Sequence, residues 1–107
     1  MTNAAALFSA SELAEGGIRA DFLPNGKVIA VYRVDGRFYA TDDTCTHGAA
    51  SLSEEGTLTG HMVLCSWHNG SFDIRTGEPC GSPCSVPLKT YPVRIVDGFV
   101  NVEFGND

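Results

Sequence analysis

The chain has 107 residues, of which 43% are hydrophobic, so it is long enough for one domain with a small core. Its formal net charge of −6 argues against nucleic acid as a partner, because phosphate binding requires clustered Lys and Arg side chains. No apolar run approaches the length of a membrane span, and residues 1–6 lack the basic and apolar segments of a signal peptide. We therefore expect a cytoplasmic protein without a membrane partner, whose cysteines are reduced and available as metal ligands.

Short strands separated by turns dominate the pattern along the chain. A single helical turn is expected at 11–16, with Ser11 as its N-cap. The hydrophobic run 27–34, the turn Asp35-Gly36 and the run 37–41 then predict a β-hairpin. Further strands are expected at 61–65, 71–75, 91–96 and 99–104, the last two joined by the turn Asp97-Gly98. Regularly spaced short strands of this kind predict an all-β sandwich or barrel.

The candidate metal ligands lie between the two predicted hairpins. We expect a single domain over residues 1–107, in which an antiparallel β-framework takes about 1–42 and about 86–107. Residues from about 43 to about 85 would form an insertion that carries two ligand loops.

Two Cys/His pairs are the most informative feature of the sequence. Cys45 and His47 form the first pair, and seventeen residues later Cys65 and His68 form the second. Two thiolates and two imidazoles suit two kinds of metal centre. One is a tetrahedral zinc site, and the other is a Rieske-type [2Fe–2S] cluster, in which two His replace two Cys on one iron.

The spacing within each pair favours the iron–sulfur cluster over zinc. Zinc knuckles usually use Cys-x₂-Cys or His-x₃₋₅-His pairs, whereas here the loops are Cys-x-His and Cys-x₂-His. Two facing loops could direct both sulfurs to one iron and both nitrogens to the other. Gly48 and Gly70 follow the two His closely, and residues without a Cβ would let backbone N–H groups approach the inorganic sulfides.

The motif resembles that of the Rieske iron–sulfur family, and most closely that of the small Rieske ferredoxins of bacterial ring-hydroxylating dioxygenases. The resemblance rests on Cys-Thr-His-Gly at 45–48, on Cys-x₂-His-x-Gly-x-Phe-Asp at 65–73, and on flanks at 34–41 and 89–93. It implies the Rieske fold and one [2Fe–2S] cluster. It also implies that Cys45 and Cys65 bind the inner iron, while His47 and His68 bind the outer iron near solvent.

The resemblance further implies an electron carrier and not an enzyme. Such a carrier takes single electrons from a flavin-dependent NAD(P)H ferredoxin reductase and passes them to a terminal Rieske non-haem iron oxygenase that acts on aromatic rings. Three His in total, two of them committed, leave too few for a 2-His-1-carboxylate iron site in this chain. The alternatives are a Rieske-like small subunit of a nitrite reductase and a zinc-stapled interaction module.

Departures from the respiratory members of the family predict a low reduction potential. Those proteins carry a disulfide at the positions of Ala50 and Trp67, and hydroxyl donors to sulfur at the positions of Gly70 and Phe72. Hydrogen bonds to sulfur stabilise the reduced state, so their absence lowers the potential. Trp67 is expected to shield the cluster, and Pro83 to belong to a loop that covers it.

Charge and the remaining cysteines complete the candidate site. No Lys or Arg occurs between Phe38 and Ile74, while this stretch holds five carboxylates, Asp42, Asp43, Glu54, Glu55 and Asp73. We expect partner docking at His47 and His68 with help from Glu54 and Glu55, although the stretch could also be ordinary solvated surface.

Cys80 and Cys84 are expected to be small, buried or half-buried residues and not ligands.

Overall fold

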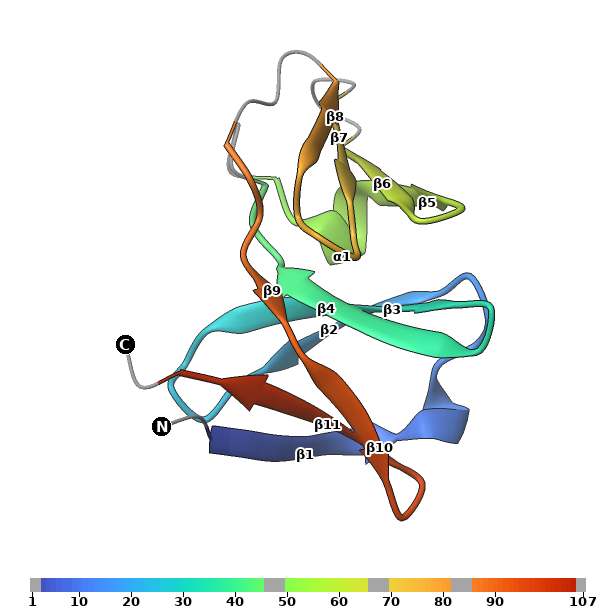
Figure 1. Cartoon of the computed structure of the whole chain (residues 1–107), viewed down its shortest axis with the longest axis vertical. Helices are drawn as coiled ribbons and strands as arrows, with labels where there is room; N and C mark the ends of the chain where they lie inside the picture. The colour runs from blue at the N-terminus through green and yellow to red at the C-terminus, as the bar shows by residue number, and fades with distance from the viewer. Residues whose placement is uncertain (1–2, 46–49, 66–69, 82–85, 106–107) are drawn as a thin grey trace.

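A computed structural model of the whole chain describes residues 3–45, 50–65, 70–81 and 86–105 (Figure 1). The secondary structure in these ranges is almost entirely β. In chain order it comprises β1 (Asn3–Ser9), the 3₁₀ turn η1 (Ala10–Glu12), β2 (Ile18–Phe22), β3 (Val28–Val34), β4 (Arg37–Asp42), α1 (Leu52–Glu55), β5 (Gly56–Thr59), β6 (Met62–Cys65), β7 (Gly70–Asp73), β8 (Pro79–Gly81), β9 (Thr90–Tyr91), β10 (Val93–Val96) and β11 (Phe99–Phe104). Every strand pair is antiparallel, which confirms the all-β prediction.

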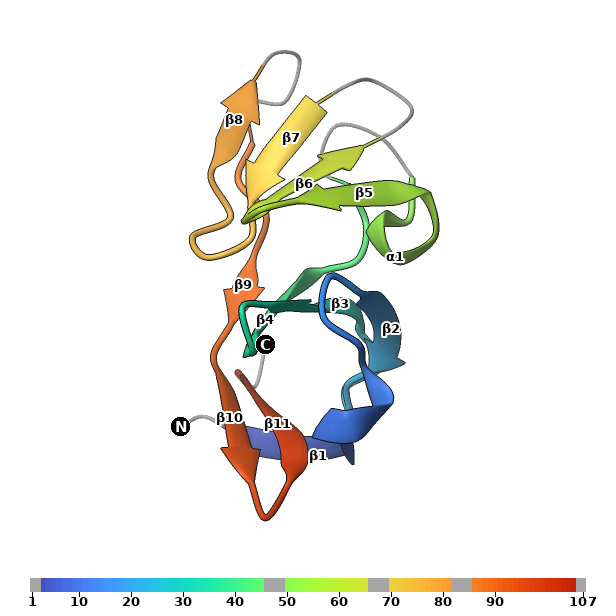
Figure 2. The same cartoon turned by 90° about the vertical axis from the view of Figure 1, so that its right-hand side faces the viewer.

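Two sheets form the framework, with strand orders β1-β11-β10 and β2-β3-β4-β9. They face one another below the rest of the chain (Figure 2). Alternation along β11 directs Val100 and Val102 inward, where they join Phe8, Ile29 and Val31 in one buried cluster. This cluster, drawn from both sheets, holds the framework together.

A third sheet, of order β5-β6-β7-β8, stands on top of the framework with α1 at its base (Figure 1). Its inward face forms a second core with the upper face of β3, from which Ala30, Tyr32 and Val34 project. Strand β3 is therefore buried on both faces, because Ile29 and Val31 belong to the framework core. This explains its nearly continuous hydrophobic sequence, which is typical of strands covered on two sides.

Both predicted hairpins are confirmed. Strand β3 pairs with β4, and β10 pairs with β11, each around an Asp-Gly turn. Asp35 and Gly36 have φ of 53° and 75°, and Asp97 and Gly98 have φ of 50° and 81°. Positive φ at both central residues is the geometry of the type I′ turn, whose twist matches that of the strands it joins.

Three local predictions need correction. The helical turn begins earlier than expected: Ser9, not Ser11, is its N-cap, and Glu12 accepts a hydrogen bond from the Ser9 N–H at 3.0 Å. The strand expected at 91–96 is broken at Pro92, which has no N–H for a ladder, so the chain crosses there from the second sheet to the first. The strand expected at 71–75 is Gly70–Asp73.

Strands β1, β2 and β8 and helix α1 are not expected from the sequence. The Ala-rich β1 and the mixed polar sequence of β2 have weak strand propensity, and each lies at a sheet edge where pairing with one neighbour stabilises it. The expected limits of the insertion, at residues 43 and 85, stay a prediction. None of the helices in the described ranges has the length and apolar character needed to cross a membrane.

Candidate metal centre

The first ligand loop begins at Cys45, immediately above the framework. The Cys45 N–H donates a hydrogen bond to the carbonyl oxygen of Ala50 at 2.9 Å, and Thr44 forms a β-bridge with Ser51. The loop is thus closed at its base by backbone contacts, with Cys45 at the closing position. The Cys45 side chain is buried, with 2% of its surface exposed.

The second ligand loop is closed in the same way. Cys65 is the last residue of β6 and pairs with Gly70, the first residue of β7. Its side chain is fully buried. Both cysteines therefore stand at the base of a six-residue loop whose two ends are held together by antiparallel pairing.

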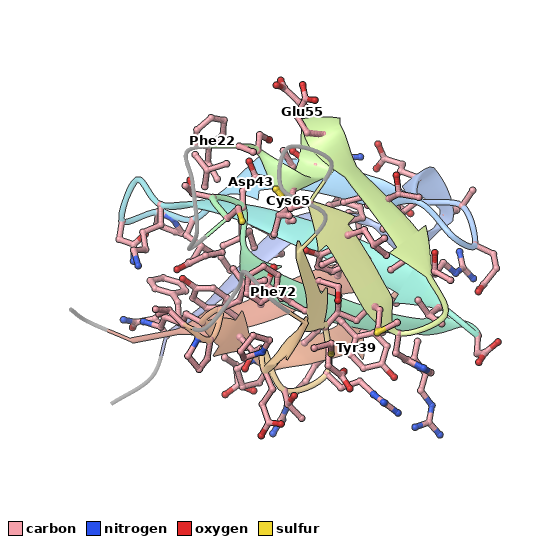
Figure 3. The ribbon with its side chains drawn as sticks, turned by 90° about the horizontal axis from the view of Figure 1, so that it is seen from above. Phe22, Tyr39, Asp43, Glu55, Cys65 and Phe72 are labelled. Atoms are coloured by element: carbon pink, nitrogen blue, oxygen red, sulfur yellow. The ribbon has the colours of Figure 1, made fainter. Side chains whose placement is uncertain are left out.

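The two cysteines belong to the same buried core. Alternation along β6 and β7 places Val63 and Cys65 on the inward face together with Gly70 and Phe72, and Cys45 belongs to the same core. Figure 3 shows Cys65 and Phe72 among these side chains, seen from above. The structure thus places the two predicted sulfur ligands, which are twenty positions apart in the sequence, in one buried core.

The predicted nitrogen ligands, His47 and His68, lie outside the described residues, as do Gly48, Trp67, Pro83 and Cys84. Within the described ranges, no group of three or more His, Cys, Asp or Glu side chains is arranged to bind a metal ion. The part of the site that is described fits an iron–sulfur cluster in its donor chemistry. It offers two buried thiols from two closed loops in an apolar core, and both loops continue into a His after one or two residues.

The acidic stretch is less uniform than the sequence suggested. Asp42 accepts a hydrogen bond from the Tyr91 hydroxyl and lies 3.8 Å from the Lys27 Nζ. Asp43 is buried and has hydrogen-bond partners of its own, so it cannot belong to a surface rim. Of the five carboxylates, only those of Glu54 and Glu55 are on exposed residues, and both lie in α1. Figure 3 shows Glu55 at the periphery of the molecule.

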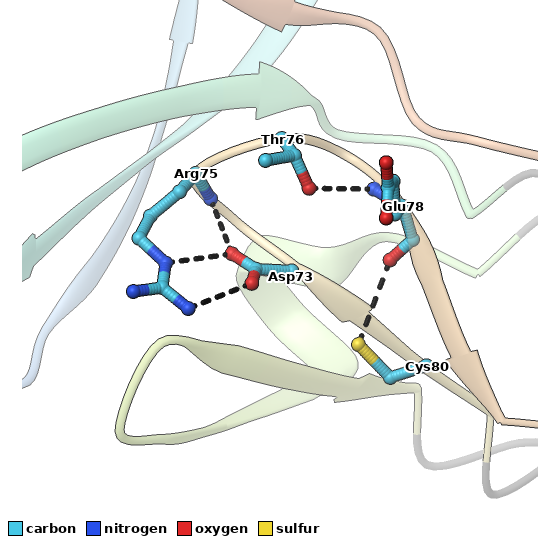
Figure 4. A network of polar contacts seen from close by, with 5 residues as sticks. All are labelled: Asp73, Arg75, Thr76, Glu78 and Cys80. Atoms are coloured by element: carbon cyan, nitrogen blue, oxygen red, sulfur yellow. Dashed lines mark hydrogen bonds and ion pairs between the residues drawn. The ribbon is translucent and has the colours of Figure 1, made fainter.

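Asp73, the remaining carboxylate of the stretch, belongs to the turn between β7 and β8 (Figure 4). It accepts hydrogen bonds from the Arg75 guanidinium at 3.1 and 2.9 Å and from the Arg75 N–H at 2.8 Å. The guanidinium is the main reason that the pKa of the Asp73 carboxyl is lowered from its ordinary value. Asp73 is therefore a turn-forming residue, and the prediction that it adds to an acidic rim is wrong.

Cys80 lies at the other end of this turn network and is exposed, which corrects the expectation that it is at least half-buried. Its Sγ is 3.6 Å from the carbonyl oxygen of Glu78 (Figure 4). His61 is partly exposed immediately before β6, and its ring makes a T-shaped contact with that of Tyr39, with ring centroids 5.6 Å apart. The expectation that His61 is not a fifth ligand stays a prediction.

Comparison with known proteins shows the family of this chain. The family described as the Rieske [2Fe–2S] domain matches residues 3–92. The chain belongs to the Rieske [2Fe–2S] domain family. This assignment confirms the predicted family and fold and overturns the alternative of a zinc-stapled module, and a Rieske [2Fe–2S] domain implies a [2Fe–2S] cluster.

Individual relatives of this Rieske domain are components of oxygenase systems. It is 49% identical to the ferredoxin component of the p-cumate 2,3-dioxygenase system of Pseudomonas putida, over 98% of this chain and 89% of that one. A chain in the solved complex of reduced oxygenase and oxidized ferredoxin in carbazole 1,9a-dioxygenase is 46% identical, with a TM-score of 0.87 and coverage of 92% and 91%. These relatives confirm the predicted class, a ferredoxin component and not a catalytic subunit.

The same fold also occurs at lower sequence identity. A putative NADH-dependent nitrite reductase small subunit from Mycobacterium tuberculosis superposes with a TM-score of 0.89 over 100% of this chain and 99% of that one. At 20% identity this likeness shows the fold alone.

Asp43 is the residue at this site whose position sequence reasoning missed. The sequence predicts it in a surface rim, whereas it is buried and binds Ser51 and Ser53, eight and ten positions later. No local signal reveals such a contact, because capping motifs are recognised over about three residues.

Proposed function

We propose that this Rieske domain is a one-electron carrier with one [2Fe–2S] cluster, held by Cys45 and Cys65 on one iron and by His47 and His68 on the other. The observation that carries the proposal is that Cys45 and Cys65 belong to one buried core, each at the base of a closed loop. The cluster, when bound, supplies reversible one-electron oxidation and reduction. The chain would hold its sulfur ligands away from water and leave the His side as the route for electrons.

The proposed partners are a flavin-dependent NAD(P)H ferredoxin reductase and a terminal Rieske non-haem iron oxygenase that hydroxylates an aromatic compound. Support for the oxygenase comes from the relative found in complex with one and from the dioxygenase system named for the relative from P. putida. A reductase is the expected electron source, since a carrier must be reduced before it can donate. A reductase that takes its electrons from NAD(P)H would place this chain in the cytoplasm, where that donor is found.

The nitrite reductase alternative is less well supported. Members of that group often lack cluster ligands, whereas this sequence has all four. The 49% identity to a dioxygenase ferredoxin also exceeds the 20% identity to the nitrite reductase subunit.

We propose that docking uses the His-bearing end of the molecule together with Glu54 and Glu55 of α1. Gly56 pairs with Cys65 across β5 and β6. Glu55 immediately precedes Gly56 and is therefore close in the chain to the strand partner of a proposed cluster ligand. Two exposed carboxylates at this position would attract a basic patch on either partner, and such attraction weakens with salt because the Debye length is about 8 Å at physiological ionic strength.

Electron transfer tests this function. With a dioxygenase reductase and oxygenase, the protein is expected to be reduced and reoxidised, at a rate that falls as ionic strength rises. Glu54→Lys should slow bimolecular reduction severalfold at low salt with an unchanged cluster spectrum, because charge steers association. Glu103→Lys makes the same change of charge on the framework strand β11 and serves as the control.

Failure to exchange electrons with either component would contradict the carrier function. Normal exchange with rates that ignore salt and Glu54→Lys would contradict only the electrostatic docking. Rates that fall equally for Glu103→Lys would point to net charge and not to the α1 surface.

A second prediction concerns the reduction potential. Phe72 is fully buried, pairs with Val63 and belongs to the same core as Cys65. Without a hydroxyl donor to sulfur the wild-type potential should lie near the low Rieske limit of about −150 mV. Phe72→Tyr should raise it, because a hydrogen bond to sulfur stabilises the more negative reduced state, and Gly70→Ser should act in the same direction.

A redox titration followed by visible absorbance checks this result. Phe38→Tyr adds the same hydroxyl to a partly buried framework residue and should leave the potential unchanged. A wild-type potential of about +300 mV, the upper Rieske limit, would refute the interpretation of Gly70 and Phe72.

A further inference from the structure

Asp43 is the one charged residue among the described ranges that is buried, with 6% of its surface exposed. Its Oδ2 accepts a hydrogen bond from the Ser51 hydroxyl at 2.6 Å, and its Oδ1 accepts one from the Ser53 N–H at 2.8 Å. Its backbone carbonyl accepts from the Leu52 N–H at 2.7 Å, and its own N–H donates to Val28 in β3 at 3.2 Å. One residue thus joins the framework to the start of α1, two positions before Cys45.

Helix α1 connects Asp43 to the second ligand loop. The Gly56 N–H at its C-terminal end bonds to the Leu52 carbonyl, and Gly56 pairs across the sheet with Cys65. A Cβ on Gly56 would lie 2.4 Å from the Leu52 oxygen and 3.0 Å from Val63, so the backbone packs closely at this end of the helix. Leu52 itself is fully buried in the core that contains both cysteines.

We propose that Asp43 is a positioning residue for the metal centre. By fixing the start of α1, which ends at the strand partner of Cys65, it sets the separation and orientation of the Cys45 and Cys65 thiols. This inference rests on the proposed function of those two cysteines as ligands. The chain of contacts runs from Cys45 through Asp43 and α1 to Gly56 and Cys65, and each link is a hydrogen bond, a strand pair or a peptide bond.

The chemistry of a carboxylate explains why Asp suits this position. Its two oxygens accept from two donors at once, a hydroxyl and an N–H, and hydrogen bonds to a charged acceptor are the strong ones. An Asn side chain has one acceptor oxygen and keeps the shape, whereas Ala has neither. Groups that orient metal ligands from one layer further out typically change metal affinity by about 10–100-fold when they are removed.

The test compares the wild-type holoprotein with Asp43→Ala, Asp43→Asn and Ser51→Ala. Asp73→Asn is the control, because Asp73 also accepts three hydrogen bonds in the same upper sheet but lies at the opposite end of β7 from Gly70. The measurements are the rate at which an iron chelator bleaches the visible spectrum and the EPR g-values of the reduced cluster. The g-values report the geometry at the iron and would not respond to a general loss of fold stability.

Asp43→Ala is expected to lose its cluster at least about tenfold faster than wild type and to show shifted g-values. Asp43→Asn and Ser51→Ala should lose the cluster at rates between those of wild type and Asp43→Ala, and Asp73→Asn should match wild type. If Asp43→Ala does not accumulate as folded protein, Asp43→Asn and Ser51→Ala decide the result, since each removes a single acceptor or donor.

Three outcomes would overturn the proposal. Unchanged bleaching rates and g-values in the Asp43 and Ser51 variants would show that the two thiols are positioned without Asp43. An equal acceleration in Asp73→Asn, with g-values unchanged throughout, would assign the effect to general stability. A wild-type protein without iron and sulfide would refute the proposed cofactor, and the role of Asp43 with it.

Discussion

Cys65→Ala is expected to yield protein without iron or acid-labile sulfide, whereas the wild type should contain about two of each per chain. Cys65 is fully buried at the base of its loop, so neither water nor a neighbouring surface side chain can take its place as a ligand. Cys45→Ala should behave alike, because its thiol belongs to the same core. Both variants should also unfold more readily, since metal binding in such small domains is coupled to folding.

Metal and sulfide analysis, with visible and EPR spectra, measures this result. Cys80→Ser is the matched control: Cys80 lies in the same upper sheet, in β8, but is exposed and bonded only to the Glu78 carbonyl among the contacts described. It should keep a full cluster. Stoichiometric zinc in the wild type, or loss of the spectrum in Cys80→Ser, would show that the ligands are misassigned.

Gly77→Ala should be among the most destabilising single substitutions that leave the ligands intact. Gly77 has φ of +80°, and a Cβ there would lie 2.0 Å from the carbonyl oxygen of Leu88. The Leu88 N–H also donates to the Gly77 carbonyl at 2.8 Å, so the turn between β7 and β8 holds the returning chain directly. Strain at positive φ costs about 1–2 kcal/mol, and overpacking adds about 1–3 kcal/mol.

Urea unfolding of the holoprotein, followed by circular dichroism, measures the change in the free energy of unfolding. Gly26→Ala separates the two contributions, because Gly26 has φ of +88° but nothing within 4 Å of its added Cβ. The free energy of unfolding of Gly26→Ala should fall only by the amount due to backbone strain. If both variants lose the same free energy, the close approach of Leu88 to Gly77 contributes nothing to stability.

The sequence by itself determined those features that depend on neighbouring residues. The two Asp-Gly turns predicted both hairpins, because two residues at positive φ fix the twist and register of the strands they join. The Cys/His pairs predicted the metal centre and its family, because ligand type and spacing are read along a short stretch of chain.

Only the tertiary structure decided which residues meet across the molecule. Cys45 and Cys65 belong to one core, and β3 is covered on both faces. Asp43, expected on the surface, is buried and accepts a hydrogen bond from the Ser53 N–H of α1. The edge strands β1 and β2 likewise form through pairing that their own propensity does not predict. The physical reason is common to all of them: their stabilising partners lie far along the chain, so burial and hydrogen bonding at these positions exist only after the sheets have packed.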